Sequence, residues 1–458
     1  MSKLAISLAL LGVMASALGA VTIYVPDDYG TIQEAVNASV NGDVIVVRPG
    51  VYVENIDFIG KEITVTTEKG PTITIIDGNK VKSVATFISG EGPGTILEGF
   101  TLTNGSGSPE PLGYVSGGAI YCEGSSPIIR NNIITKNIVP AGFGAGIFLF
   151  ESSPEITGNT FHENQSKFCG GGIYSRKSSP LITNNTIFNN KSHETTGGGI
   201  TCSWNARPRI INNTIYKNES QYGGGIASGI GAHPIVVNNI LWDNFSPRGL
   251  EIWIGDPATP ATMDIDFCDV KGGISSVFLE TGSTINWGTS MIDADPLFAD
   301  ISGDDYHLTW NSPCKDAGTN GAPGLPAIDR EGDPRIVGGV ADLGSDEFYT
   351  HLYCIGGIVA GNTIEIKVAD SPNAGPVTLA LGSGVQDPPL TTPYGDLYIQ
   401  LPVVWQKTLG NIPANGILSF AGKLPGSWQS GEEYALQALI GPFSTGSYLT
   451  NLMLLVVE

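Results

Sequence analysis

Aromatic and charged side chains recur about 26 residues apart in the middle of the chain, and their types and spacing favour carbohydrate chemistry. Aromatic rings pack against the C–H faces of sugars, and charged groups orient sugar hydroxyls or carboxylates. The predicted substrate-binding residues are Tyr121, Phe148, Tyr174, Trp204 and Trp253. Two acids, Glu123 and Glu151, and two bases, Arg176 and Lys177, stand beside them.

An ordinary protein surface is the alternative explanation for the same residues. Strands favour aromatic and β-branched residues in any case, and mixed charges are common on a solvated face. Under this alternative the protein is a structural stalk or adhesin that displays its C-terminal domain.

A repeat positions these side chains. A glycine-rich start followed by isoleucine recurs at Ile120, Ile147, Ile173, Ile200 and Ile226, with spacings of 27, 26, 27 and 26 residues. A proline follows in each unit, and two rows of asparagine come next. The first row is Asn132, Asn159, Asn185, Asn213 and Asn239, and the second is Asn137, Asn164, Asn190, Asn218 and Asn244.

The repeat predicts an all-β solenoid. Each unit holds three short apolar runs separated by turn formers, and no run can bury its apolar face alone. Stacked coils let each strand pair in parallel with its counterparts above and below. We therefore expect a parallel β-helix of about 10–12 coils over residues 21–348, with a capping helix near residues 31–36. With the isoleucines inward, the aromatic row should point outward to solvent.

The asparagine rows have two interpretations. Asn164, Asn190, Asn218 and Asn244 lie in Asn-x-Ser sequons, which in an exported protein accept glycans. Because they keep the phase of the repeat, we expect ladders of asparagine at corners with left-handed backbone instead.

The net charge and the N-terminal segment indicate which partners and which location to expect for the protein. The formal net charge is −21, which argues against nucleic acid because its phosphates would be repelled. Residues 1–20 combine Lys3, a short apolar core and small residues before a cleavage point, which predicts a signal peptide and a secreted, extracellular or cell-surface protein. No later run of roughly 18 apolar residues follows, so no membrane insertion is expected. A monomer is expected.

Six cysteines in an exported chain invite disulfides. Cys122 and Cys202 share a repeat position three coils apart. At about 4.8 Å per coil they are too far apart to bridge, so we expect small core residues. Cys268 with Cys314 is the pairing considered.

The opening of the chain carries a family resemblance. Ile23-Tyr24-Val25-Pro26, the predicted capping segment and Gly42-Asp43-Val44-Ile45-Val46-Val47 resemble the opening of the pectate-lyase-like superfamily of right-handed parallel β-helix repeat proteins. The resemblance covers roughly residues 21–345 and implies a right-handed helix. The acid and arginine motifs of its pectin methylesterase-like members and the Asp pairs of its polygalacturonase-like members are absent.

Lyase-like members of that superfamily use calcium-binding acids with an arginine or lysine base. The resemblance thus implies Arg176 or Lys177 as the base that abstracts the proton at the sugar C5. Glu123 and Glu151 would hold a calcium ion that neutralises the uronate carboxylate. Calcium is the candidate cofactor, and the sequence does not identify a cofactor beyond this candidate.

A second resemblance covers Asp295-Pro296-Leu297-Phe298, Asp305-Tyr306-His307-Leu308 and Asp342-Leu343-Gly344-Ser345-Asp346-Glu347-Phe348. It looks like the closing segment of bacterial surface β-helix proteins, where it is structural and its acids imply no catalysis. Asp300, Asp304 and Asp305 loosely resemble a calcium loop, although their spacing does not fit an EF-hand.

Beyond residue 348 the repeat stops. Residues 349–458 show short runs of alternating apolar and polar residues between Gly- and Pro-rich turns, which predicts a small β-sandwich.

Besides the structural stalk, two functional hypotheses follow for the whole chain. The protein is a secreted or cell-surface β-helix that binds extracellular polysaccharide, or it is a polysaccharide lyase or hydrolase that acts on an acidic polysaccharide.

Overall fold

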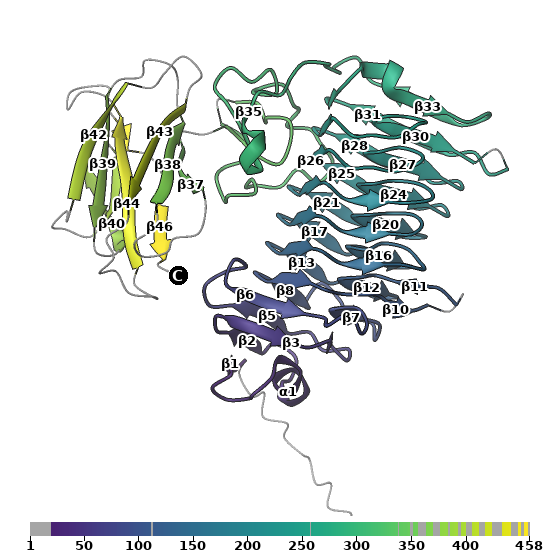
Figure 1. The fold of residues 1–458 in the computed structure, drawn as a ribbon, viewed down its shortest axis with the longest axis horizontal. Coiled ribbons are helices and arrows are strands. Elements are labelled where there is room, and N and C mark those ends of the chain that lie inside the picture. The colour runs from purple at the N-terminus through teal and green to yellow at the C-terminus, as the bar shows by residue number, and fades with distance from the viewer. Residues whose placement is uncertain are drawn as a thin grey trace, which may run out of the picture.

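A computed structural model describes residues 20–348, apart from 111–112, 257 and 338, and the strands that follow residue 350. The predicted signal peptide lies almost wholly outside the described residues. The chain is a right-handed parallel β-helix with three long sheets, as predicted (Figure 1). Among the described residues, no helix combines the length and apolar character needed to cross a bilayer.

Nine coils contribute one strand to each of the three sheets, and sheet 1 has one further strand at each end. Sheet 1 has eleven strands, in agreement with the predicted number of coils: β1 (Thr22–Val25), β2 (Val44–Val47), β5 (Thr64–Thr67), β8 (Ile96–Glu98), β13 (Ile128–Arg130), β17 (Glu155–Thr157), β21 (Leu181–Thr183), β25 (Arg209–Ile211), β28 (Ile235–Val237), β31 (Thr262–Asp266) and β34 (Thr284–Trp287). Sheet 2 has nine strands: β4 (Ile56–Asp57), β7 (Ala85–Phe87), β12 (Ile120–Glu123), β16 (Ile147–Phe150), β20 (Ile173–Arg176), β24 (Ile200–Ser203), β27 (Ile226–Gly229), β30 (Ile252–Gly255) and β33 (Val277–Leu279). Sheet 3 has nine strands: β3 (Gly50–Val53), β6 (Thr74–Asp77), β9 (Thr101–Thr103), β14 (Ile133–Thr135), β18 (Thr160–His162), β22 (Thr186–Phe188), β26 (Thr214–Tyr216), β29 (Ile240–Trp242) and β32 (Asp269–Val270).

Shorter elements complete this part of the chain. They are the hairpin of β10 (Ser108–Pro109) and β11 (Val115–Ser116), the ladder of β15 (Ile138–Val139), β19 (Gln165–Ser166) and β23 (Lys191–Ser192), the 3-10 turns η1 (Gly273–Ser276) and η2 (Ile301–Gly303), and the antiparallel pair β35 (Phe298–Asp300) and β36 (Asp305–Leu308).

Helix α1 (Ile32–Ala38) covers the first coil and contacts β1 and β2 (Figure 1). The Thr31 hydroxyl accepts a hydrogen bond from the Glu34 N–H, which satisfies one of the free donors at the helix start. Ile32, Ala35 and Val36 are fully buried on the face that meets the coil. The predicted capping helix is therefore confirmed.

The isoleucines of sheet 2 form the predicted interior row. Ile120, Ile147, Ile173 and Ile200 are direct neighbours in the ladder, and all are fully buried. Gly170, three residues before β20, has a φ of +71°, which glycine adopts without strain. A Cβ on the following Gly171 would lie 2.5 Å from the Gly198 oxygen of the next coil, so close approach of the coils also requires glycine.

Both asparagine rows form buried ladders. The Asn185 side-chain oxygen accepts from the backbone N–H and the Nδ2 of Asn159, and the Asn185 Nδ2 donates to Asn213 Oδ1 and to the Ile156 carbonyl. The second row repeats this pattern through the four sequon asparagines and is buried. The ladder interpretation is confirmed.

One detail of the ladder prediction is wrong. The left-handed residue is the one before each ladder asparagine, such as Asn184 (φ 56°) before Asn185 and Glu163 (φ 56°) before Asn164. The preceding residue turns the corner, and the ladder asparagine then points inward, where its amide satisfies the backbone groups that the corner leaves without partners.

The ladder of the second row ends in a carboxylate. Glu251, which is 1% exposed, accepts hydrogen bonds from the Asn244 N–H at 3.2 Å and from Asn244 Nδ2 at 2.6 Å. Burial raises the pKa of Glu251 to about 8, although the bonds from Asn244 act in the opposite direction.

The cysteines are core residues rather than disulfides among the described part of the chain. Cys122 and Cys202 are free and fully buried, as predicted. The pairing considered for Cys268 and Cys314 is wrong, since both thiols are free. Cys314 donates instead to the Asp269 carboxylate, and Cys268 accepts from the Asn239 N–H.

Antiparallel strands follow the β-helix, which agrees with a β-sandwich. They are β37 (His351–Ile355), β38 (Thr363–Ala369), β39 (Pro376–Gly382), β40 (Val385–Thr392), β41 (Gly395–Ile399), β42 (Trp405–Asn411), β43 (Ile417–Lys423), β44 (Glu433–Ile440), β45 (Tyr448–Leu449) and β46 (Met453–Val456). β38 pairs with β37 and β43, and β39 pairs with β42 and β44.

Candidate functional site

The aromatic row of sheet 2 points away from the coil interior but is not exposed. Tyr121, Phe148 and Tyr174 are ladder neighbours, and their exposed fractions are 3%, 0% and 4%. Adjacent ring centroids lie 5.4 and 5.6 Å apart. The prediction of a solvent-facing aromatic row is therefore wrong.

Rings from outside the repeat cover this row. Phe143 packs on Tyr174 with centroids 5.4 Å apart, and Tyr114 and Phe168 pack on Phe143 at 5.1 and 5.3 Å. These residues come from the hairpin and from loops between coils. Phe143 packs directly on the small apolar cluster that Tyr121, Phe148 and Tyr174 form on the outer face of sheet 2. Burial of stacked rings is favourable, which explains why the row is covered.

Arg176 is held inside this cover. Its guanidinium lies 3.5 Å from the Glu110 carboxylate and between the rings of Phe150 and Trp204, at 5.4 and 4.9 Å from their centroids. The side chains of Arg176 and Glu110 are only 10% and 2% exposed. Burial raises the pKa of Glu110, and the neighbouring Arg176 opposes that rise. A guanidinium paired with a carboxylate stays protonated, so this placement disfavours Arg176 as a proton-abstracting base.

Lys177 is more accessible than Arg176. Its ammonium lies 3.0 Å from Glu151 Oε1, and both side chains are about half exposed. An exposed pair of this kind contributes little to stability, so both groups remain available to a ligand.

A pocket opens beside the N-terminal end of the aromatic row, with a volume of about 690 Å³. Its lining brings together three of the predicted residues, Tyr121, Glu123 and Glu151. The Tyr121 hydroxyl donates to Glu123 at 2.5 Å, which fixes the carboxylate at the pocket wall. Phe148, Tyr174, Arg176, Trp204 and Trp253 are not part of the lining. Of these, Trp204 is 40% exposed, and Trp253 packs on Tyr222.

Two charged residues of the pocket were not predicted. Asp57 and Lys82 come from the early coils, whose glycine and asparagine markers are degenerate. Asp57, Thr86 and Tyr121 occupy the same ladder position on β4, β7 and β12. Aligning the early coils on their apolar runs would have placed Asp57 in line with Tyr121.

The predicted calcium ligands Glu123 and Glu151 both contact other side chains. Among the described residues, the group of three or more carboxylate, imidazole or thiol ligands that converge is His307, Glu331 and Asp346, and neither glutamate belongs to it. Glu123 is engaged by Tyr121, and Glu151 by Lys177. A cation there would have to displace an ammonium.

The predicted calcium loop in the closing segment is organised by hydrogen bonds. Asp300 Oδ1 accepts from the N–H groups of Ser302 and Gly303, and Asp304 accepts from the Tyr306 hydroxyl. Its acids thus act as acceptors that hold loops in place, in keeping with the structural role that the second resemblance implies.

The comparisons with known proteins bear on the fold. Residues 48–257 match the sequence model of the family described as right handed beta helix region. This protein is a right-handed parallel β-helix protein. No curated protein matches this sequence.

Solved structures similar to this β-helix protein are remote. A pectin methylesterase from carrot has a TM-score of 0.36 and 14% identity, with 61% of this chain and 90% of that chain covered. A pectin methylesterase mutant in complex with a hexasaccharide has a TM-score of 0.27 and 11% identity, with 59% and 93% covered. The enzymatically active domain of tailspike protein 2 from bacteriophage CBA120 has a TM-score of 0.30 and 10% identity, with 92% and 73% covered. At these values they carry no argument about the site of the β-helix protein.

Proposed function

We propose that this β-helix protein is a secreted or cell-surface protein that binds extracellular polysaccharide in the pocket lined by Asp57, Lys82, Tyr121, Glu123 and Glu151. The observation that carries the proposal is an open pocket whose charged groups converge beside a tyrosine on the outer face of a rigid sheet. Carboxylates at a fixed position accept hydrogen bonds from adjacent sugar hydroxyls, and these charge-assisted bonds are stronger than neutral ones.

The charge of the pocket favours a neutral polysaccharide over a uronate polymer. Three carboxylates and one ammonium line it, and the whole chain carries a net charge of −21. A polyanion would be repelled both on approach and in the pocket. This supports binding of a hydroxyl-rich glycan and weakens the case for a lyase that acts on an acidic polysaccharide.

The test is binding of oligosaccharides by calorimetry, with neutral and uronate series compared in the presence and absence of EDTA. We expect neutral oligosaccharides to bind, and Glu123→Gln to weaken binding by about tenfold or more, because it removes a charged hydrogen-bond acceptor. Glu155→Gln is the matched control, since Glu155 is an exposed acid of sheet 1 outside the pocket.

Two results would contradict the proposal: no oligosaccharide binds, or Glu123→Gln and Glu155→Gln behave alike. Release of unsaturated products from a uronate polymer by the unmodified protein would instead support the lyase alternative.

A further inference from the structure

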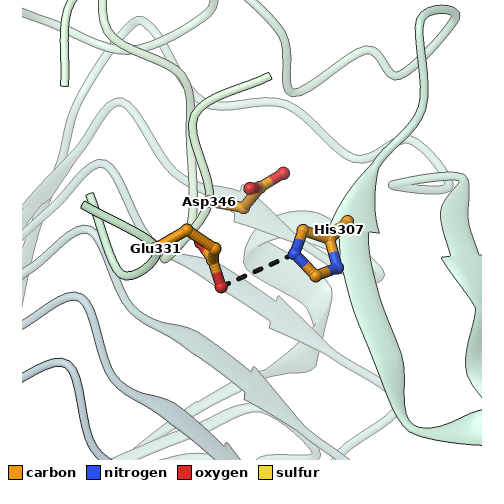
Figure 2. A group of neighbouring side chains, drawn as sticks. All are labelled: His307, Glu331 and Asp346. Carbon is orange, nitrogen blue, oxygen red and sulfur yellow. Dashed lines mark ion pairs between the residues drawn. The ribbon is translucent and has the colours of Figure 1, made fainter. Parts of the chain in front are cut away.

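Three side chains that can bind metal converge in the closing segment, far from the pocket on sheet 2. His307, Glu331 and Asp346 each offer one ligand atom, and these atoms lie within 4.8 Å of one another (Figure 2). They come from β36, from the loop after Arg330 and from the stretch before Phe348. A cavity of about 50 Å³ between them is large enough for an ion with one water molecule.

The imidazole of His307 is oriented for coordination. Asp305, which is 6% exposed, places its Oδ1 2.5 Å from His307 Nδ1. The other ring nitrogen, Nε2, faces Glu331 Oε1 at 3.5 Å. A carboxylate on one ring nitrogen fixes the proton there and directs the lone pair of the second nitrogen at a ligand, which is the arrangement behind most metal-binding histidines.

Buried acidic residues outnumber buried basic residues around the cavity. Asp305, Asp329, Asp346 and Glu347 are buried around the cavity, and the buried cation nearby is Arg335, which lies 3.8 Å from Glu347. Arg330 also lines the cavity: its Nε lies 3.7 Å from Glu331 Oε1, and its guanidinium donates to the hydroxyls of Thr186 and Thr160 on sheet 3.

We propose that His307 Nε2, Glu331 and Asp346 bind one divalent transition-metal ion, with Zn²⁺ as the best match. An imidazole among the ligands favours zinc over calcium, which takes oxygen ligands. The ion would join three stretches of the closing segment that are distant in sequence, so it would hold these stretches together.

The experiment uses the full chain, stripped with EDTA and titrated with ZnCl₂ or CaCl₂ by calorimetry, with thermal unfolding of the same samples. We expect one Zn²⁺ per chain, weaker binding of Ca²⁺, and a higher unfolding temperature with Zn²⁺. Glu331→Gln and His307→Gln should each weaken Zn²⁺ binding by about tenfold or more. Glu331 has a partly exposed side chain, so its substitution tests the site without endangering the fold.

The matched control is His233→Gln. His233 pairs with Asp264 at 2.8 Å, as His307 pairs with a carboxylate, but the described residues supply no converging third ligand there. This variant should bind Zn²⁺ like the unmodified protein. The proposal is overturned if Zn²⁺ does not bind saturably, if Glu331→Gln or His307→Gln keeps full affinity, or if His233→Gln loses as much as they do. In that case His307 is an imidazolium held between Asp305 and Glu331.

Discussion

Replacing Asn185 with alanine is expected to lower the free energy of unfolding by about 3–5 kcal/mol. Asn185 is fully buried, and its side chain accepts from two donors of Asn159 while it donates to Ile156 and Asn213. Alanine leaves several of these groups buried without partners, and each such group costs about 1–3 kcal/mol. Urea unfolding followed by circular dichroism measures the change.

The control for this prediction lies in the same coil. Asn189 is exposed and left-handed (φ 52°), so Asn189→Gly keeps the backbone conformation and disturbs no ladder. We expect it to change stability by less than about 1 kcal/mol. Equal effects of the two substitutions would show that the ladder contributes nothing particular to the stack.

The stability of the protein should fall as the pH rises from about 4.5 to about 8. Glu251 contributes to this effect together with other buried acids, because burial raises its pKa in the folded state to about 8, above the value near 4.3 of an unfolded chain. A raised carboxyl pKa means that the folded state holds the proton where the unfolded state has lost it. The stabilisation is thus complete below the unfolded pKa, declines by at most about 1.4 kcal/mol per pH unit, and is gone above the folded pKa.

Urea unfolding at intervals from pH 4.5 to pH 9 tests this prediction. Glu251→Gln is the control, since an amide cannot titrate in this range, and its stability curve should be flatter than that of the unmodified protein over the same window. Other buried acids contribute equally to both chains, so the difference between the curves reports Glu251. Parallel curves would mean that Glu251 keeps an ordinary pKa.

The register of the β-helix could be predicted because the same residue types recur in the sequence at a nearly constant spacing. The isoleucine row, the glycine starts and the two asparagine rows recur every 26 or 27 residues, and parallel pairing of stacked coils follows from that period alone. The ladder role of the sequon asparagines followed from the same phase.

The surface of the helix could not be predicted in the same way. Glu110 and Tyr114 lie in an insertion before Ile120 that does not keep the period. Phe143 and Phe168 lie in regular units, but in the turns before the glycine starts, where the repeat pattern does not say which way a side chain points, so their packing with Tyr114 and Tyr174 could not be predicted. The convergence of His307, Glu331 and Asp346 has the same cause, since it depends on loops of irregular path.

The asparagine ladder also gives the molecule a direction. In each step the amide of one coil donates to the side-chain oxygen of the next coil, so every coil presents donors on one face and acceptors on the other. Such a coil is an interchangeable module: duplication or deletion of one 26-residue unit would leave every junction chemically identical and would change the length of the molecule by about 4.8 Å. Glu251, an acceptor with no amide to pass the pattern on, ends the second asparagine row, so such a unit could be added only before it in the ladder.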